Sequence, residues 1–351
     1  MIQRLTASRL FDGVSMRGPT TVSWKDGLIV DVSDATSTER RDAELIAPGF
    51  VDLQVNGIGH ERVADLRCDV ASIAERLRSQ GVTSWLPTVP TQDPTYYTRD
   101  TVDALRRHIE LPKDMPQAMG IHFEGPLLGA RPGAHREDFF DVDESILDVL
   151  EMGRMVTIAP EHALANAAML RLCPQGIVVS LGHTAASPED IRHFVRNGGR
   201  CATHLFNAMT GIDHVSGGVA LEVLGETRLV FSMIADLRHV SAQVLRLAWR
   251  LGGERMFLVS DQVSSDDASL RSPSARLRGA ATGVDDGLRN LVNACDVPLH
   301  HALAMVTRVP ANLLGDNQRG RLGRGRRADI VLLDADLGVH GVVCNGFPTS
   351  R

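Results

Sequence analysis

The stretch "FVDLQVN", residues 50–56, is the first long apolar run of the chain and is typical of a strand buried on both faces. Seven similar runs follow it, with helical patterns such as 69–81, 187–199 and 241–253 between them. We therefore expect eight strands, at residues 50–56, 83–89, 118–125, 155–161, 176–183, 201–207, 229–236 and 256–261. This alternation predicts an α/β protein with a (β/α)8 barrel. An open doubly wound sheet is the alternative fold, although no glycine-rich phosphate fingerprint follows the first strand.

The two ends of the chain have a different pattern from the middle. Residues 1–46 and 319–351 contain short alternating strands separated by Asp-Gly and Asn-Gly turn signals. We expect both ends to pair with each other in a small flanking β-sandwich domain. The barrel domain is then predicted to span residues 47–318.

The composition narrows the class of function. The 351 residues carry a net charge of −6, which gives no basic surplus for binding a nucleic acid backbone. No apolar run approaches the roughly 20 residues that a membrane span needs, and the first residues lack the apolar core of a secretory signal. Five cysteines without a C-x-x-C pair argue against a disulfide framework and against a thiolate zinc site. We expect a cytoplasmic protein that binds neither nucleic acid nor membrane.

Four of the predicted strands end in side chains that bind metals or transfer protons. These are Glu124, His183, His204 and Asp261. In a barrel, the carboxyl ends of all strands share one rim, where the active sites of such folds lie. Imidazole nitrogen and carboxylate oxygen bind zinc and similar ions at about 2.0–2.2 Å, and a catalytic site uses three protein ligands. The pattern predicts a metal held by Glu124, His183 and His204, with Asp261 transferring protons to and from a metal-activated water.

Three further histidines have weaker signals. A single histidine at the end of a strand is more often a hydrogen-bonded core residue than a ligand. His135 lies in a Gly/Pro-bearing loop where an imidazole can polarise a substrate carbonyl, or it is a surface residue. His239 follows the seventh strand on the same rim, or simply begins a helix. His122 points to the same side of its strand as Glu124 but deeper, and is interpreted as a core or supporting residue.

Several motifs in order carry a family resemblance. They are "APGFVDLQVNG", "GIHFEGPLL" with "PGAH", "SLGHTAA", "ATHLFNAM", "IADLRHV", "LVSDQV" and "GRLGRGRRADIVLLD". Together they resemble the N-acetylglucosamine-6-phosphate deacetylases of the amidohydrolase superfamily, nearly from end to end. The resemblance implies a barrel with a flanking β-sandwich, a homodimer, and metal-dependent hydrolysis of N-acetyl-D-glucosamine 6-phosphate to the free amine and acetate.

The resemblance also implies roles for individual residues. Many amidohydrolases end their first strand in His-x-His, whereas this family often has Gln-x-Asn there, as in Gln54 and Asn56, and works with one metal. Glu124, His183 and His204 would hold one divalent ion per chain, with zinc as the first choice and iron, manganese or cobalt as alternatives. The implied catalytic residues are Asp261, as general acid and base, and His135, which polarises the acetyl carbonyl. The implied substrate-binding residues are His135, Asn207, Ala208 and His239.

Two segments depart from the family pattern. Val215 or Ser216 stands where the family has an arginine that reaches the phosphate in the neighbouring subunit, so a phosphate contact is missing. Residues 260–283 are more polar than the family's segment, and Arg271, Arg276 or Arg278 is a possible replacement for that contact. Three alternatives therefore stay open: a deacetylase of an isomeric or unphosphorylated N-acetylhexosamine, a non-catalytic barrel paralogue, and a two-metal cyclic-amide hydrolase. The last is disfavoured by Gln54 and Asn56.

Overall fold

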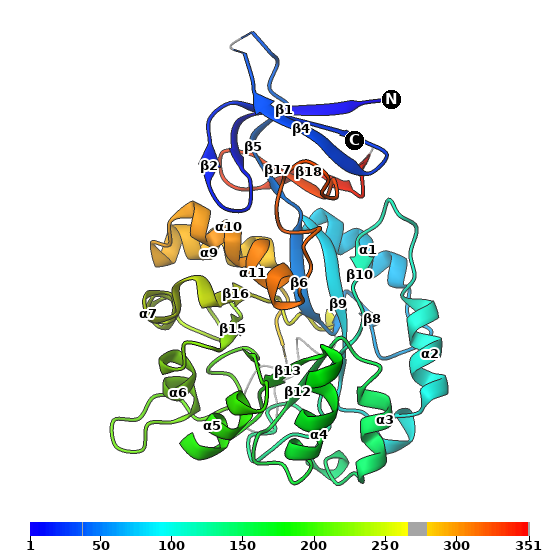
Figure 1. Ribbon diagram of the computed structural model, residues 1–351, viewed down its shortest axis with the longest axis vertical. Coiled ribbons are helices and arrows are strands. Elements are labelled where there is room, and N and C mark those ends of the chain that lie inside the picture. Colours follow the sequence, from blue (N-terminus) through cyan, green and yellow to red (C-terminus); the bar gives the residue numbers. More distant parts are fainter. Residues whose placement is uncertain (37, 266–278, 350–351) are drawn as a thin grey trace.

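The computed structural model describes residues 1–36, 38–265 and 279–349. Its elements form a parallel barrel, which helices surround, and a second, curled sheet beside it that holds both chain ends (Figure 1). The α/β class and the barrel predicted from the sequence are thereby confirmed, and the doubly wound alternative is wrong.

The barrel consists of eight parallel strands in chain order. They are β6 (Phe50–Val55), β9 (Val82–Pro90), β11 (His122–Glu124), β12 (Met155–Ile158), β13 (Val178–Leu181), β14 (Cys201–Ala202), β15 (Val230–Met233) and β16 (Met256–Leu258). Each predicted run overlaps one of these strands, and β9 extends one residue beyond its run at each end. Just beyond the end of β16 the chain pairs again with the end of β6, since Asp261 N donates to Gln54 O at 3.0 Å and Val55 bridges Gln262 in parallel. These contacts join the last strand to the first and close the barrel.

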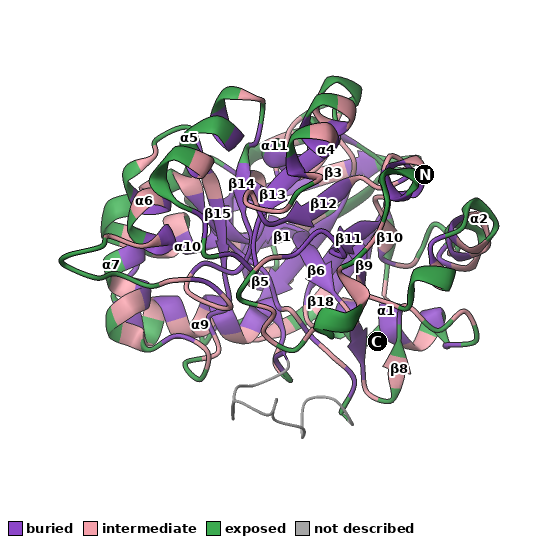
Figure 2. Cartoon of the chain, turned by 90° about the horizontal axis from the view of Figure 1, so that it is seen from below, coloured by how far each residue is buried: buried purple, intermediate pink, exposed green. Residues whose placement is uncertain are grey.

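Helices cover the outside of the barrel and turn their buried faces inward (Figure 2). The three expected helices are present as α1 (Val70–Ser79), α5 (Pro188–Arg196) and α7 (Ala242–Gly252). In α5 the side chain of Ser187 accepts from Asp190 N while the Asp190 carboxylate accepts from Ser187 N, a capping box that fixes where the helix begins. The other α-helices within the described residues are α2 (Arg99–His108), α3 (Leu147–Leu150), α4 (Ala165–Leu172), α6 (Val219–Gly225), α9 (Val284–Cys295), α10 (Leu299–Met305) and α11 (Arg308–Leu313).

The second sheet brings together the two ends of the chain, as the sequence predicts. It contains β1 (Gln3–Phe11), β2 (Met16–Arg17), β3 (Thr20–Lys25), β4 (Leu28–Asp34), β5 (Ala43–Pro48), β17 (Ile330–Leu333), β18 (Val339–Cys344) and β19 (Phe347–Pro348). The central pairing joins β17 to β5, and the sheet encloses a small apolar core of its own that includes Trp24 and Ile330. The division at residues 46/47 and 318/319 stays a prediction, because β5 runs across the first of these boundaries.

Three short strands lie outside these two sets. Strand β10 (Gln117–Ala118) pairs with β9, and β7 (Gly57–Ile58) pairs with β8 (Glu61–Arg62) in a hairpin after the first barrel strand.

The five cysteines are unpaired. Over the part of the chain that the structure describes, none of the helices has the length and apolar character needed to cross a bilayer.

Candidate active site

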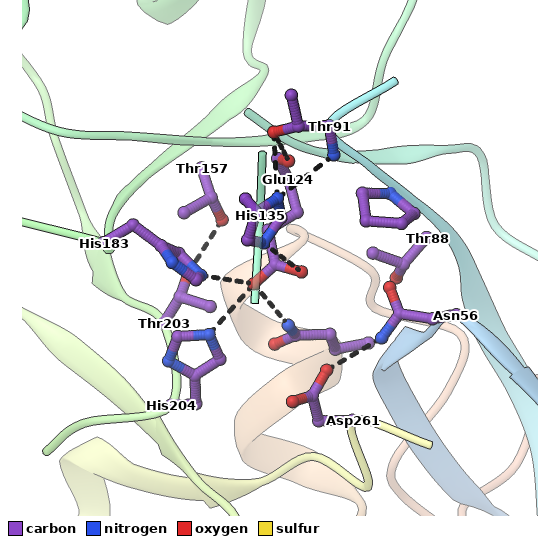
Figure 3. A network of polar contacts seen from close by, with 12 residues as sticks. Asn56, Thr88, Thr91, Glu124, His135, Thr157, His183, Thr203, His204 and Asp261 are labelled. Atoms are coloured by element: carbon purple, nitrogen blue, oxygen red, sulfur yellow. Dashed lines mark hydrogen bonds and ion pairs between the residues drawn. The ribbon is translucent and has the colours of Figure 1, made fainter. Parts of the chain in front are cut away.

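The four rim residues predicted from the sequence lie together at the carboxyl ends of the barrel strands (Figure 3). Glu124 ends β11, His183 follows β13, His204 follows β14 and Asp261 follows β16. Glu124, His183 and His204 are almost completely buried, each with 3–4% of its surface exposed. The prediction that these residues converge is therefore correct as geometry, whereas their chemical roles remain proposals.

Backbone strain accompanies three of these positions. His183, His204 and Asp261 have φ angles of 51°, 33° and 51°, in the left-handed region that residues other than glycine rarely adopt. Such conformations cost about 1–3 kcal/mol each and gather at functional sites, where the surrounding structure enforces them. They also explain why the sixth strand is short: β14 ends at Ala202, because the backbone reverses at His204 and does not continue as a strand to residue 207.

Three nitrogen atoms converge on one oxygen of Glu124. Its Oε1 lies 2.8 Å from Gln54 Nε2, 2.9 Å from His204 Nε2 and 3.2 Å from His183 Nε2. Burial alone would raise the pKa of Glu124, but the hydrogen bonds and charges of His183 and His204 outweigh it and hold the pKa well below its usual range. Glu124 is therefore a carboxylate in this site.

The tautomer of His183 tests whether these donors fit a metal. His183 Nδ1 lies 3.0 Å from the carbonyl oxygen of Pro132, which only accepts, so this nitrogen carries the proton in the neutral ring. In that neutral form the lone pair on Nε2 faces the carboxylate of Glu124, and a positive charge at this point, either a metal ion or a second proton on the ring, removes the repulsion. Ligand atoms bound at 2.0–2.2 Å to one tetrahedral ion lie roughly 3.4 Å apart, close to the distances seen here. The residues present therefore fit a divalent metal ion.

His135 also reaches this cluster, which leaves two possible ligand sets. Its Nε2 lies 3.8 Å from Glu124 Oε2, and ligand atoms of Glu124, His135 and His183 all fall within 4.8 Å of one another. However, the backbone N–H of Thr91 donates to His135 Nδ1 at 3.2 Å, so in the neutral ring the proton is on Nε2. Burial and the neighbouring His183 lower the pKa of His135 to about 3, which keeps the ring neutral. His135 is thus arranged to donate a hydrogen bond from Nε2, and His204 is the better third ligand.

A glycine makes this approach of the His135 loop possible. Gly133 has a φ of +64°, and a Cβ there would lie 3.1 Å from Ala208 Cβ and 3.3 Å from His183 Cε1. The loop "RPGAH" therefore packs directly against the imidazole of His183, and the carbonyl oxygen of Pro132 accepts a hydrogen bond from His183 Nδ1.

Asp261 is held by an amide in the same way as Glu124 but has the opposite electrostatic character. Asn56 Nδ2 donates to Asp261 Oδ1 at 2.8 Å. Burial, followed by the negative charge of Glu124, raises the pKa of Asp261 to about 8. A carboxyl group whose pKa lies near neutrality is suited to accept a proton and then to donate it.

The sequence did not predict the two amide contacts, although a signal was present. Gln54 and Asn56 stand two residues apart on β6, so both side chains face the same side of the strand. The sequence alone interprets them as replacements for two histidine ligands. In the structure each one orients a carboxylate, Gln54 for Glu124 and Asn56 for Asp261.

His122 lies deeper in the barrel, in agreement with its interpretation as a core residue. Its Nδ1 bonds the carbonyl of Leu53 at 3.0 Å and its Nε2 lies 2.8 Å from Thr157 Oγ1, so both ring nitrogens are occupied by protein. Burial lowers its pKa to about 4.

A cavity of about 1040 Å3 opens above the cluster. The predicted substrate-binding residues Asn207, Ala208 and His239 all line it, together with Glu124, His135, His183, His204 and Asp261. Asp236, which the sequence analysis missed, fixes His239: its Oδ2 lies 2.8 Å from His239 Nδ1, so the other ring nitrogen is left for the cavity. The candidates Arg271, Arg276 and Arg278 lie outside the described residues.

Comparisons with known proteins agree with this arrangement. The amidohydrolase family model matches residues 45–347. A human N-acetylglucosamine-6-phosphate deacetylase is 31% identical, over 88% of this chain and 84% of its own length. An N-acetylgalactosamine-6-phosphate deacetylase of Escherichia coli O157:H7 is 30% identical over 92% of both chains. The solved structure of N-acetyl-D-glucosamine-6-phosphate deacetylase from Mycobacterium smegmatis, in complex with N-acetyl-D-glucosamine-6-phosphate, superposes with a TM-score of 0.90 at 28% identity, covering 99% of each chain.

Proposed function

The chain belongs to the amidohydrolase family, and we propose that it hydrolyses the acetamide of N-acetyl-D-glucosamine 6-phosphate to D-glucosamine 6-phosphate and acetate. The observation that carries this proposal is the convergence of Glu124, His183 and His204 beside Asp261 and His135, at the floor of one cavity. The similar proteins named above are deacetylases of amino sugar phosphates, which supports the choice of substrate class.

The proposed metal site uses Glu124, His183 and His204 as ligands, with Gln54 orienting the glutamate. One divalent ion bound there would polarise the acetyl carbonyl and lower the pKa of a water molecule towards 7. Zinc is our first choice, and iron, manganese and cobalt suit the same nitrogen and oxygen donors.

The residues of the chain supply the proton transfers. His135 donates a hydrogen bond from Nε2 to the acetyl carbonyl oxygen and stabilises the negative charge that develops there. Asp261 accepts a proton from the attacking water as the new carbon–oxygen bond forms. It then delivers that proton to the amide nitrogen as the carbon–nitrogen bond breaks, so that the sugar leaves as an amine and acetate remains.

The sugar is proposed to lie along the cavity away from this cluster. Asn207, the backbone of Ala208 and His239 line that part and would contact the ring and its substituents. Supporting this, Asn207 is braced by bonds from its backbone N and its Nδ2 to the carbonyl of His204, which ties the sugar side of the cavity to a proposed ligand. A homodimer and a cytoplasmic location complete the proposal, both from the sequence analysis.

A second candidate differs only in the sugar. N-acetyl-D-galactosamine 6-phosphate is favoured by the Escherichia coli relative, whose 30% identity nearly equals the 31% of the human glucosamine relative. The two sugars differ in the orientation of one hydroxyl group, which the cavity walls must discriminate.

The test is acetate release by the purified protein, stripped of metal and reloaded separately with zinc, manganese, iron or cobalt. N-acetylglucosamine 6-phosphate, N-acetylgalactosamine 6-phosphate and the two unphosphorylated sugars are compared at equal concentration. We expect the first to give the highest kcat/KM and metal-free protein to be inactive. Absence of acetate release from every sugar with every metal contradicts the proposal and favours a non-catalytic barrel.

A further inference from the structure

The loop in which the family resemblance implies a phosphate-binding arginine carries no cation at that position in this chain. Residues 211–217 form a short turn in which Asp213 pairs with Gly217, and the Asp213 carboxylate accepts from Val215 N and Ser216 N. Val215 lies at the tip of this loop with 83% of its surface exposed. A 6-phosphate in the cavity must therefore be neutralised from elsewhere.

Three arginines line the cavity: Arg62, Arg136 and Arg238. Arg136 is already engaged, because Nε and Nη2 donate to the Asp138 carboxylate at 3.1 and 2.5 Å and its guanidinium lies 4.3 Å from the centre of the Phe139 ring. Arg62 donates from Nε to Ser264 Oγ at 3.3 Å. Both side chains are held in place by protein contacts.

Arg238 differs from these two arginines. Within residues 1–36, 38–265 and 279–349 its guanidinium makes no hydrogen bond or ion pair, while its backbone N–H donates to Asp236 Oδ1 at 2.8 Å. The preceding residue, Leu237, has a φ of +61°, so the chain reverses sharply at this point. The backbone of Arg238 is thus anchored while its charged group is available in the cavity.

The same carboxylate anchors the next residue. His239 N donates to Asp236 Oδ1 at 2.8 Å, and His239 Nδ1 lies 2.8 Å from Asp236 Oδ2. Asp236 therefore anchors the backbone of both Arg238 and His239, and both residues line the cavity. Asp65, an acidic residue that also lines the cavity, is paired with Arg67 at 3.3 Å and not with Arg238.

We propose that Arg238, supplied by the same subunit as the catalytic cluster, binds the phosphate of the substrate. This inference rests on the proposed function, and it adds the residue that makes the enzyme prefer a phosphorylated sugar. The planar guanidinium suits phosphate, because two of its N–H groups can donate to two phosphate oxygens at once. The acetamide on C2 and the phosphate on C6 lie at opposite ends of the sugar, and the lining of the cavity likewise includes both the buried cluster and the exposed Arg238.

The experiment compares Arg238→Leu and Arg238→Lys with the wild type on N-acetylglucosamine 6-phosphate and on N-acetylglucosamine. We expect Arg238→Leu to lower kcat/KM for the phosphorylated sugar by about ten- to hundredfold, mostly through KM, and to leave the unphosphorylated sugar unchanged. Arg238→Lys should recover part of the loss, since it restores the charge without the two-point geometry. The matched control is Arg250→Leu, which removes an exposed arginine outside the cavity and should change neither substrate.

Two outcomes overturn the inference: an equal loss on both sugars, which marks Arg238 as merely structural, and no loss on either. A direct titration with D-glucose 6-phosphate, which has no acetamide, separates this inference from the proposed function. If the wild type releases no acetate but binds glucose 6-phosphate, and Arg238→Leu alone weakens that binding about tenfold or more, then the function fails and the phosphate site stands. If the wild type, Arg238→Leu and Arg250→Leu bind it equally, the phosphate site fails whatever the activity.

Discussion

The two ends of the cavity are built in different ways. At the floor, Glu124, His183 and His204 lie at strand ends, are nearly inaccessible to solvent, and are braced by neighbouring side chains and carbonyls. At the mouth, Val215 and Arg238 lie on exposed loops, and their side chains make few contacts. A barrel fixes chemistry at the ends of its strands and leaves substrate choice to its loops. The difference would allow a phosphate-binding residue to be placed on one loop or another without disturbing the proposed metal ligands.

The largest effect is expected at Asp261. Replacing it with asparagine keeps the shape of the side chain and an oxygen that can accept from Asn56 Nδ2. It removes the group that transfers protons, and such transfer typically contributes 10²- to 10⁴-fold to the rate. We expect kcat to fall by about 10⁴-fold, measured as acetate release with zinc supplied. Metal content, measured by mass spectrometry, should stay near that of the wild type. Unchanged turnover would remove Asp261 from the mechanism.

A second prediction distinguishes the two ligand sets at the floor. His204→Asn should empty the metal site, whereas His135→Asn should keep the metal and lower kcat by about 10²- to 10³-fold, the usual cost of losing one donor to a developing negative charge. Metal content and kcat are measured on both variants after identical metal loading. The reverse result, with metal lost from His135→Asn and kept in His204→Asn, would mean that Glu124, His135 and His183 are the ligands.

A smaller effect is expected from the residue that orients the glutamate. Gln54→Leu removes the N–H that donates to Glu124 Oε1, and loss of such a supporting contact typically weakens metal binding by about 10- to 100-fold. Competition with a chelator measures this affinity. Gln318→Leu, which changes a glutamine on the exposed surface, is the matched control. Equal affinity in Gln54→Leu and the wild type would show that Glu124 needs no such support.

The smallest effect concerns the pH dependence of stability in the metal-free protein. Burial lowers the pKa of His135 to about 3, whereas the unfolded chain has the ordinary value near 6.5. Below pH 6.5 the unfolded state therefore binds a proton that the folded state excludes. The stability that this neutral histidine contributes is complete above pH 6.5, and it is lost as the pH falls, by at most about 1.4 kcal/mol per pH unit.

Denaturant unfolding of the metal-free protein at pH 7.5, 6 and 5 checks this expectation. His135→Asn should make the free energy of unfolding fall less steeply below pH 6.5 than in the wild type. His214→Asn, at an exposed site on the loop of residues 211–217, should leave the slope as it is. If the free energy of unfolding falls equally steeply with pH in all three proteins, His135 has the same pKa in the folded and unfolded states.

The barrel could be predicted from the sequence because each strand has a local sequence signal. A continuous apolar run between two amphipathic helices is visible without any knowledge of its partners, and the strands β6 to β16 follow in chain order. The meeting of Glu124, His183 and His204 followed from the same logic, since parallel strands end at one rim.

Other features depend on contacts that no local pattern reveals. The pairing of Gln54 with Glu124 joins residues 70 positions apart, and the proton position on His135 is set by the backbone of Thr91, 44 positions away. The left-handed backbone at His183 is likewise imposed by its surroundings. Asp236 carried a partial signal, because an aspartate three residues before a histidine is well spaced to orient it.

The junction between β16 and β6 has a consequence for how the protein is made. Asp261 meets Asn56 only where the last barrel strand pairs with the first, and the three proposed ligands are all synthesised earlier. A nascent chain that has emerged only as far as β15 already contains all three proposed metal ligands but lacks Asp261, the proposed proton-transfer residue. The proposed deacetylation therefore needs the closing contact between the last and first strands, so acetate release would report that the barrel is complete.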